Sequence, residues 1–257
     1  MRAVNHGGAM NRTKRLPTAT IILYAIFVTF TCLSCAGFDS QEYFGGLIEA
    51  KVPIYLPELE PTTSTQDYKV ALNCGIAVID ALACIYNQDQ TALPRYMGMV
   101  YDYAKKLGIS ETVLHKLGRI TAAMDQGDWR KVLQLSDGFV GNVVEELDKA
   151  GKKDEAFLAL LAWSLEGLYI TGKSVNNRFS PESAKLLRNV SLSKNLEDEL
   201  KSLSVGLKAK KEVKAIMAAL PKINQIINRP ESYTYTQTDA KELISICEPL
   251  RKTLLSD

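Results

Sequence analysis

The chain has 257 residues, of which 46% are hydrophobic, 23% charged and 8% aromatic, with 16 glycines and 9 prolines. These proportions are typical of a globular protein and exclude collagen-like, low-complexity and disordered chains. The only histidines are His6 and His115, so we expect no histidine-based metal site and few forms of histidine-based catalysis.

The first 34 residues have the pattern of a secretory signal peptide. An apolar run, Ile21–Phe30, follows a segment that contains basic but no acidic residues. This run has the length of a signal-peptide core and is too short to predict a membrane span. Met10 is an alternative start, because a signal beginning there has more ordinary proportions. The basic residues are Arg2, Arg12, Lys14 and Arg15.

A cysteine follows the apolar run where a lipid would be attached. The segment Thr31–Gly37 (TCLSCAG) resembles a bacterial lipobox, although Cys32 stands where that pattern usually has leucine. The resemblance implies lipidation of Cys35, which would become the mature N-terminus. Ala36 after it implies the outer membrane, with the domain facing the periplasm. Cleavage by ordinary signal peptidase near Ser34 is the alternative.

Cleavage of this leader would change the charge of the protein. The formal net charge of the whole chain is +2, and loss of the four basic residues lowers it to −2. The basic run Lys208–Lys214 carries too few charges for a nucleic-acid footprint. We therefore expect no nucleic-acid partner, and a solvent-exposed helix face at this run, with contact to anionic lipid or peptidoglycan as the alternative.

Three regions follow from the pattern: a lipoprotein signal peptide over 1–34, a lipidated cysteine and tether over 35–65, and one all-helical domain over 66–257. Prolines 53, 57 and 61 exclude a long helix in the tether, and they weaken the only candidate strand, Val52–Leu56. The expected helices span 66–87, 92–107, 111–126, 129–149, 154–171, 181–191, 194–227 with a break, and 238–255.

Capping residues support these boundaries. Gly108 and Gly151 each follow a basic last turn and predict helix ends. Ser110 and Asp128 are favourable N-caps, and Ser180 precedes a proline at a helix start. Pro221 predicts a kink or break in the long helix near the C-terminus.

A weak repeat suggests how the helices are arranged. The turns at 87–90 and 125–128 are similar, and Asp89 lies 39 residues before Asp128. A two-helix unit of about 40 residues is typical of tetratricopeptide or HEAT-like α-solenoids. We therefore predict an all-α fold of stacked helical hairpins, with an irregular helical bundle as the alternative.

Two stretches resemble a group of uncharacterised bacterial lipoproteins. They are ALNCGIAVIDA at 71–81, preceded by VPIY at 52–55, and WSLEGLY at 163–169. The resemblance covers about residues 45–172 and implies an exported all-helical protein. It implies no activity.

The segment Gly167–Ser174 matches the nucleotide-binding pattern G-x-x-x-x-G-K-[ST]. A phosphate loop needs a strand before it and small residues within it, whereas here a predicted helix comes first and the interior is Leu-Tyr-Ile-Thr. We expect no nucleotide binding, and we expect Gly172 to end the helix of Trp163.

Two carboxylates lie within strongly apolar helices. Asp80 shares a helical face with Asn73, and Glu166 shares one with Trp163. A buried carboxylate must be paired, hydrogen-bonded or protonated. Together with Tyr169 of the second resembling stretch, these residues are candidates either for locking helix contacts or for orienting a ligand.

The three cysteines beyond the leader allow two interpretations. Cys74 and Cys84 are ten residues apart on one predicted helix, about 15 Å along its axis, which is too far for a disulfide. Either could pair with Cys247, or all three could be small core residues.

These observations favour a membrane-anchored, non-enzymatic helical scaffold of the bacterial cell envelope that binds a protein or peptide partner. The alternative is a small-molecule carrier or sensor with a pocket near Asp80, Glu166 and the tyrosine-rich helix Tyr96–Tyr103. A hydrolase has least support, because the sequence offers no nucleophile–base pair or metal cluster. No metal or cofactor is expected.

Overall fold

The structure is a computed structural model that describes residues 41–58 and 60–256. Within these ranges every regular element is a helix, which confirms the all-α prediction. The elements are α2 (Gln41–Glu49), α3 (Asp67–Tyr86), α4 (Leu93–Lys106), α5 (Glu111–Asp125), α6 (Trp129–Lys149), α7 (Lys153–Asn177), α8 (Pro181–Ala184), η1 (Lys185–Leu187), α9 (Val190–Ser202), α10 (Val205–Lys208), α11 (Lys211–Ile227) and α12 (Gln237–Leu255). The signal peptide and Cys35 lie outside the described residues.

Local capping explains why the first helices begin and end as predicted. The Ser110 hydroxyl accepts a hydrogen bond from the Val113 amide, and the Asp128 carboxylate accepts one from the Lys131 amide. Gly108 and Gly151 follow α4 and α6 with φ of +83° and +73°, in the left-handed region that favours glycine. These four capping predictions are confirmed.

Helix α7 is longer than expected. It continues through Gly172 to Asn177, so the prediction that Gly172 ends it is wrong. This glycine faces α12, where an added Cβ would lie 3.4 Å from Ile244 and 3.5 Å from Leu243. The whole G-x-x-x-x-G-K-S match therefore lies inside a helix, where the backbone amides bond to carbonyls of the same helix and cannot wrap a phosphate.

Of the two outcomes predicted for Pro221, a kink or a break, the break does not occur there. Helix α11 runs through this proline, and the chain breaks instead on either side of the short helix α10. A proline removes the hydrogen bond to the carbonyl four residues earlier, here that of Met217. Met217 is exposed, so water can satisfy this carbonyl while the flanking Leu220 and Ile223 stay buried.

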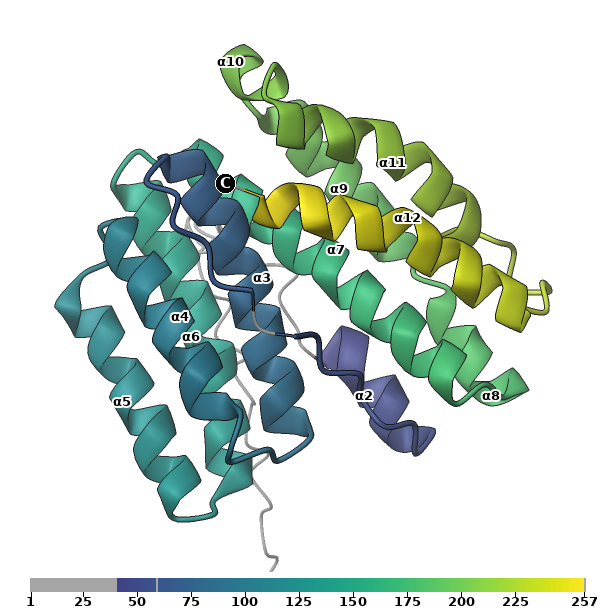
Figure 1. Cartoon of the computed structure of the whole chain (residues 1–257), viewed down its shortest axis with the longest axis horizontal. Coiled ribbons are helices and arrows are strands. Elements are labelled where there is room, and N and C mark those ends of the chain that lie inside the picture. Colours follow the sequence, from purple (N-terminus) through teal and green to yellow (C-terminus); the bar gives the residue numbers. More distant parts are fainter. Residues whose placement is uncertain (1–40, 59, 257) are drawn as a thin grey trace, which may run out of the picture. The chain divides into compact units, whose positions relative to one another are not determined.

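Helices far apart in the chain are neighbours in space. Helix α3 packs most extensively against α7 and α4, and α7 packs in turn against α12, as Figure 1 shows. In a solenoid each unit contacts only its neighbours along the chain. The packing is therefore that of an irregular helical bundle, not of hairpins stacked in sequence.

Helix α3 lies at the centre of this packing. By length and composition it could cross a membrane, but 83% of its most apolar window is buried by the rest of the domain. Its neighbours are α4, α6, α7 and α12. This burial is typical of the core helix of a globular domain.

The segment predicted as a tether is largely part of the domain, which is a correction to the expected boundary at residue 66. The described residues from Gln41 onward pack with the domain. Phe44 and Leu47 of α2 are fully buried, and Val52 and Ile54 after it are nearly so. The non-helical residues 52–58 and 60–62, which we call the strap, lie along the helices (Figure 1). Apolar residues beside the prolines pack into the core. The composition of this segment had instead indicated a flexible tether.

Candidate functional site

The two candidate carboxylates meet at one arginine. Arg251 on α12 donates from Nε to Glu166 Oε1 over 2.8 Å and from Nη2 to Asp80 Oδ2 over 3.4 Å. Its Nη1 donates to Glu60 Oε1 on the strap over 2.6 Å. The strap also offers the carbonyl of Glu58, 3.4 Å from Nη2. This arginine cluster therefore joins α3, α7, α12 and the strap.

The cluster is closed to solvent except at the strap. The side chains of Arg251, Asp80 and Glu166 are 7%, 4% and 2% exposed, whereas that of Glu60 is 48% exposed. A buried ion pair contributes little net stability, but removing one partner leaves an uncompensated charge in the core. The arginine cluster therefore fixes how α3, α7, α12 and the strap pack together, and we call it the lock.

Burial changes the protonation of the lock. It raises the pKa of Asp80 well above its usual value, and the nearby Glu166 carboxylate raises it further, against the opposing effect of Arg251. Burial also raises the pKa of Glu166, although the arginine opposes this rise. Burial lowers the pKa of Arg251, but the two carboxylates more than compensate, so the guanidinium stays charged. One cation facing two buried carboxyls favours protonation of Asp80.

The strap is fastened along its length by hydrogen bonds. The Tyr96 hydroxyl donates to the Pro57 carbonyl, and the Asn73 side-chain amide donates to the Thr62 hydroxyl. The Tyr55 amide donates to the Ser174 hydroxyl over 2.8 Å. Asn73, one of the candidate residues, therefore positions the strap.

Tyr169 and Trp163 flank the same region. The guanidinium of Arg251 lies 5.9 Å from the centre of the Tyr169 ring, which also meets the Tyr55 ring edge-on at 5.9 Å. Lys173 lies over both tyrosine rings and pairs with Glu248 at 3.2 Å. Trp163 is buried on α7. The five candidate residues thus lie in the core or against the strap.

Sequence analysis missed the two partners of the carboxylates. Arg251 had a detectable signal, because it lies four residues after Cys247 and between Leu250 and Leu254, on the buried face of α12. Glu60 had none, since it belongs to a segment without helical periodicity. The two missed residues, Arg251 and Glu60, are therefore the ones that link the two carboxylates and the strap into one cluster.

A second buried pair was also missed. Lys69 at the start of α3 lies 3.3 Å from Glu212 at the start of α11 and donates to the Ser256 carbonyl over 3.1 Å. The Tyr68 hydroxyl donates to the same glutamate over 3.3 Å. This pair ties both ends of the domain to α11.

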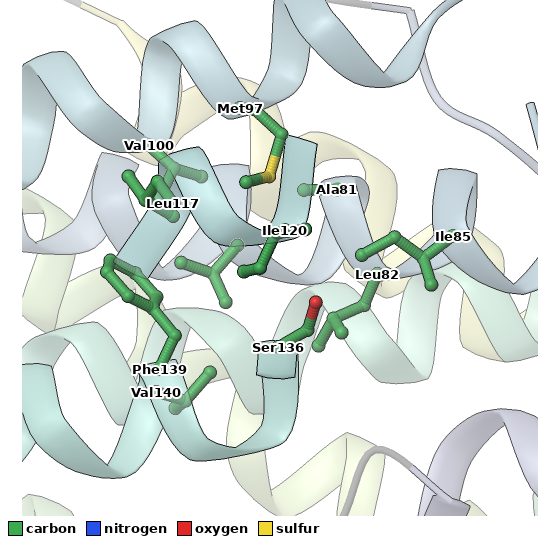
Figure 2. Close-up of a pocket in the computed structure, with 11 residues that line it drawn as sticks. Ala81, Leu82, Ile85, Met97, Val100, Leu117, Ile120, Ser136, Phe139 and Val140 are labelled. Atoms are coloured by element: carbon green, nitrogen blue, oxygen red, sulfur yellow. The ribbon is translucent and has the colours of Figure 1, made fainter. Parts of the chain in front are cut away.

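Two hollows of the described domain lie near the candidate residues in sequence, and neither is lined by Asp80 or Glu166. One is an apolar cavity of about 20 Å³ between α3, α4, α5 and α6, room for a single water-sized molecule. Figure 2 shows its lining of aliphatic and aromatic side chains, with Ser136 as a polar exception. The hydroxyl of Ser136 donates to the Val132 carbonyl over 2.8 Å, so its proton is already used within α6.

The other hollow is a surface feature beside the strap. It encloses about 370 Å³ between the strap at Pro61 and Thr62 and the last turns of α4. The α4 side chains lining it are Met99, Asp102, Tyr103, Lys105 and Lys106. It is the larger of the two hollows and is built of charged and aromatic side chains.

The cysteines are core residues. Cys74, Cys84 and Cys247 are all buried and form no disulfide. Burial raises the pKa of both Cys74 and Cys84 to about 12, so these thiols are not nucleophiles at neutral pH. The core interpretation of the three cysteines is confirmed. Among the described residues, no group of three or more His, Cys, Asp or Glu side chains could hold a metal ion.

Comparison with known proteins gave no match to a family model, to a curated protein or to a solved structure.

Proposed function

We propose that this protein is a lipid-anchored lipoprotein of the bacterial cell envelope whose helical domain binds a protein or peptide partner and catalyses no reaction. The observation that carries the proposal is the fastening of the strap by the arginine cluster. Cys35 lies six residues before Gln41 in the sequence. The strap lies between Cys35 and the helices of the domain core in the sequence. Because the arginine cluster holds the strap against these helices, a lipid on Cys35 would hold the whole domain at the membrane surface, where it could meet a partner.

The use of the buried polar groups supports a non-enzymatic role. Asp80 and Glu166 both bind the guanidinium of Arg251, so neither carboxylate faces a substrate or an attacking water. Hydrolysis by a carboxylate pair needs both groups at the wall of an open cleft. The two carboxylates and Arg251 therefore serve to hold the helices together.

The surface hollow beside the strap is the candidate contact for the partner. Its volume lies in the range of ligand sites, and its lysines, aspartate and tyrosine suit a polar peptide better than an apolar small molecule. It lies next to the strap, so a partner bound there would contact the part of the domain that is joined to the anchor.

Two experiments test the proposal. Mass spectrometry of the N-terminal peptide should find a diacylglyceryl modification on Cys35, retained in Cys32→Ala and lost in Cys35→Ala. An unmodified N-terminus beginning at Ser34 to Gly37 would contradict the anchor.

For the partner, a photo-crosslinking residue at Asp102, in the hollow, should yield a discrete adduct in native membranes. The matched control is Arg119, an exposed position on α5. Adducts that are equal at both positions, or absent from both, would contradict a partner at this hollow.

A further inference from the structure

Exposed apolar side chains gather at one end of the domain. Five large apolar side chains of the described residues are exposed, and three of them belong to segments that adjoin one another. Ile48 is on α2, Phe179 is in the turn between α7 and α8, and Val190 begins α9, three residues after the end of η1. Helix α2 packs against η1 and α7, and η1 against α8. We call this region the anchor-side face.

Uncompensated positive charge surrounds these apolar side chains. Four exposed basic residues lie in the same segments: Lys51, Arg178, Lys185 and Arg188. None of them forms an ion pair with a carboxylate of the described residues. Among the side chains of these segments that the structure describes, the exposed acids are Glu49 and Glu182. Basic residues outnumber acids among these side chains, whereas the chain without its predicted leader has a net charge of −2.

The path of the chain places this face beside the anchor. Six residues from Cys35 to Gln41 span at most about 20 Å even when fully extended. Gln41 begins α2, and α2 packs where α3 and α7 end: Phe44 meets the Tyr86 ring at 5.3 Å, and Gly46 adjoins Leu186. A lipid on Cys35 would therefore hold this end of the domain near the bilayer.

The opposite end of the domain carries the most exposed apolar residue. Val205 on α10 is 85% exposed. The amide of the preceding Ser204 donates to Asp154 at the start of α7 over 3.2 Å, whereas Phe179 follows the end of α7. The 25 residues of α7 cover about 37 Å at 1.5 Å per residue. Val205 and the anchor-side face thus lie at opposite ends of one long helix.

We propose that the anchor-side face lies on the membrane, with Ile48, Phe179 and Val190 in the lipid headgroup region and the surrounding basic residues on anionic headgroups. The inference rests on the proposed lipid anchor and adds an orientation to it. The acyl chains on Cys35 would tether the domain, and a second contact of apolar and basic residues would add to this binding and fix the orientation of the domain. A cation near an anionic surface contributes about 1 kcal/mol, roughly a fivefold change in affinity.

Depth-dependent quenching tests this orientation. The full-length protein, with Ile48→Cys or Val205→Cys carrying a fluorophore, is reconstituted into vesicles of phosphatidylcholine and phosphatidylglycerol with brominated acyl chains. The three core cysteines are buried and do not compete for the label. We expect quenching at Ile48→Cys and none at Val205→Cys. Quenching at Val205→Cys alone, or at neither position in vesicle-bound protein, would overturn the proposal.

A charge variant tests the headgroup contact separately. Lys185→Glu combined with Arg188→Glu should reduce the quenching at Ile48→Cys in anionic vesicles, whereas Lys208→Glu combined with Lys211→Glu near Val205 should leave it unchanged. Equal effects of the two pairs would overturn the charge contribution.

Failure of the anchor gives a different result from failure of the orientation. If Cys35 carries no lipid, Cys32 and Cys35 are replaced by alanine so that only the introduced thiol is labelled, and the proteins are added to vesicles with and without phosphatidylglycerol. Quenching at Ile48→Cys that needs the anionic lipid then still supports the face, and its absence overturns it.

Discussion

The two sides of α3 are held together by different forces. Toward α4, α5 and α6, the contacts are apolar, down to the small cavity of Figure 2. Toward α7, α12 and the strap, a buried arginine bridges two carboxylates, and hydrogen bonds fasten the strap. Apolar contacts tolerate substitutions of similar volume, whereas the loss of either partner of a buried ion pair strongly destabilises the fold. The strap side should therefore be the more sensitive of the two.

The largest expected effect is at Arg251. Replacement by methionine, Arg251→Met, leaves Glu166 and Asp80 buried without their cation, and we expect a loss of about 3–5 kcal/mol in the free energy of unfolding. Urea denaturation measures this loss in the free energy of unfolding. The adjacent Lys252, whose side chain is 69% exposed, is the matched control. Lys252→Met should change stability by less than about 0.5 kcal/mol. Equal losses of stability in Arg251→Met and Lys252→Met would contradict the expected sensitivity of the strap side of α3.

A close helix contact on the same side gives the next largest effect. A Cβ on Gly75 of α3 would lie 2.1 Å from the Ala159 carbonyl oxygen of α7, so one backbone would have to move. We expect Gly75→Ala to cost about 2–3 kcal/mol. Gly118 on α5 has nothing within 4 Å of its added Cβ, so Gly118→Ala should stabilise by about 0.5–1 kcal/mol. Thermal unfolding of both variants tests the difference in sign.

The apolar side was also the more predictable from sequence. Helices α4, α5 and α6 alternate apolar and polar faces and end at glycines with caps, so local rules gave their boundaries. The contacts on the other side join residues 60, 80, 166 and 251, and no local pattern relates positions so far apart. Asp80 and Glu166 were recognisable as buried carboxylates. Their shared partner depended on which helices pack together, which periodicity does not specify.

Tertiary packing also overrode two local signals. Gly172 and Pro221 are both helix-breaking residue types, and each lies inside a helix. At Gly172 the missing side chain admits α12, and at Pro221 water can donate a hydrogen bond to the exposed Met217 carbonyl. The prolines of the strap were interpreted correctly as non-helical, but the depth to which the strap is buried was not foreseen.

A conservative substitution should show the tolerance of the apolar side. Ile120 of α5 lines the cavity and is 1% exposed. Ile120→Val removes one methylene beside space that already exists, and we expect a loss of about 0.5–1.5 kcal/mol in urea denaturation with an unchanged slope. A loss as large as that of Arg251→Met would show that this side is packed as strictly as the lock.

The smallest expected effect is a change in how stability depends on pH. The pKa of Asp80 is raised in the folded protein, so the folded state holds a proton that the unfolded state releases above about pH 4. This contribution is complete below that pH and is lost as the pH rises through the folded-state pKa. Asp80→Asn should therefore give a shallower fall of unfolding free energy as the pH rises above about 4, as urea titrations at each pH would measure.

Asp239 at the start of α12 provides a control of opposite sign. Its pKa is lowered in the folded protein: burial opposes the shift, but hydrogen bonds from Thr236 and Tyr233 and the charge of Arg229 outweigh it. Its contribution is present above the unfolded pKa of about 4 and is lost as the pH falls through the lower folded value. Asp239→Asn should thus flatten only the acid limb. If Asp80→Asn also acted only on the acid limb, Asp80 would be ionised in the folded protein, and Arg251 would balance two negative charges.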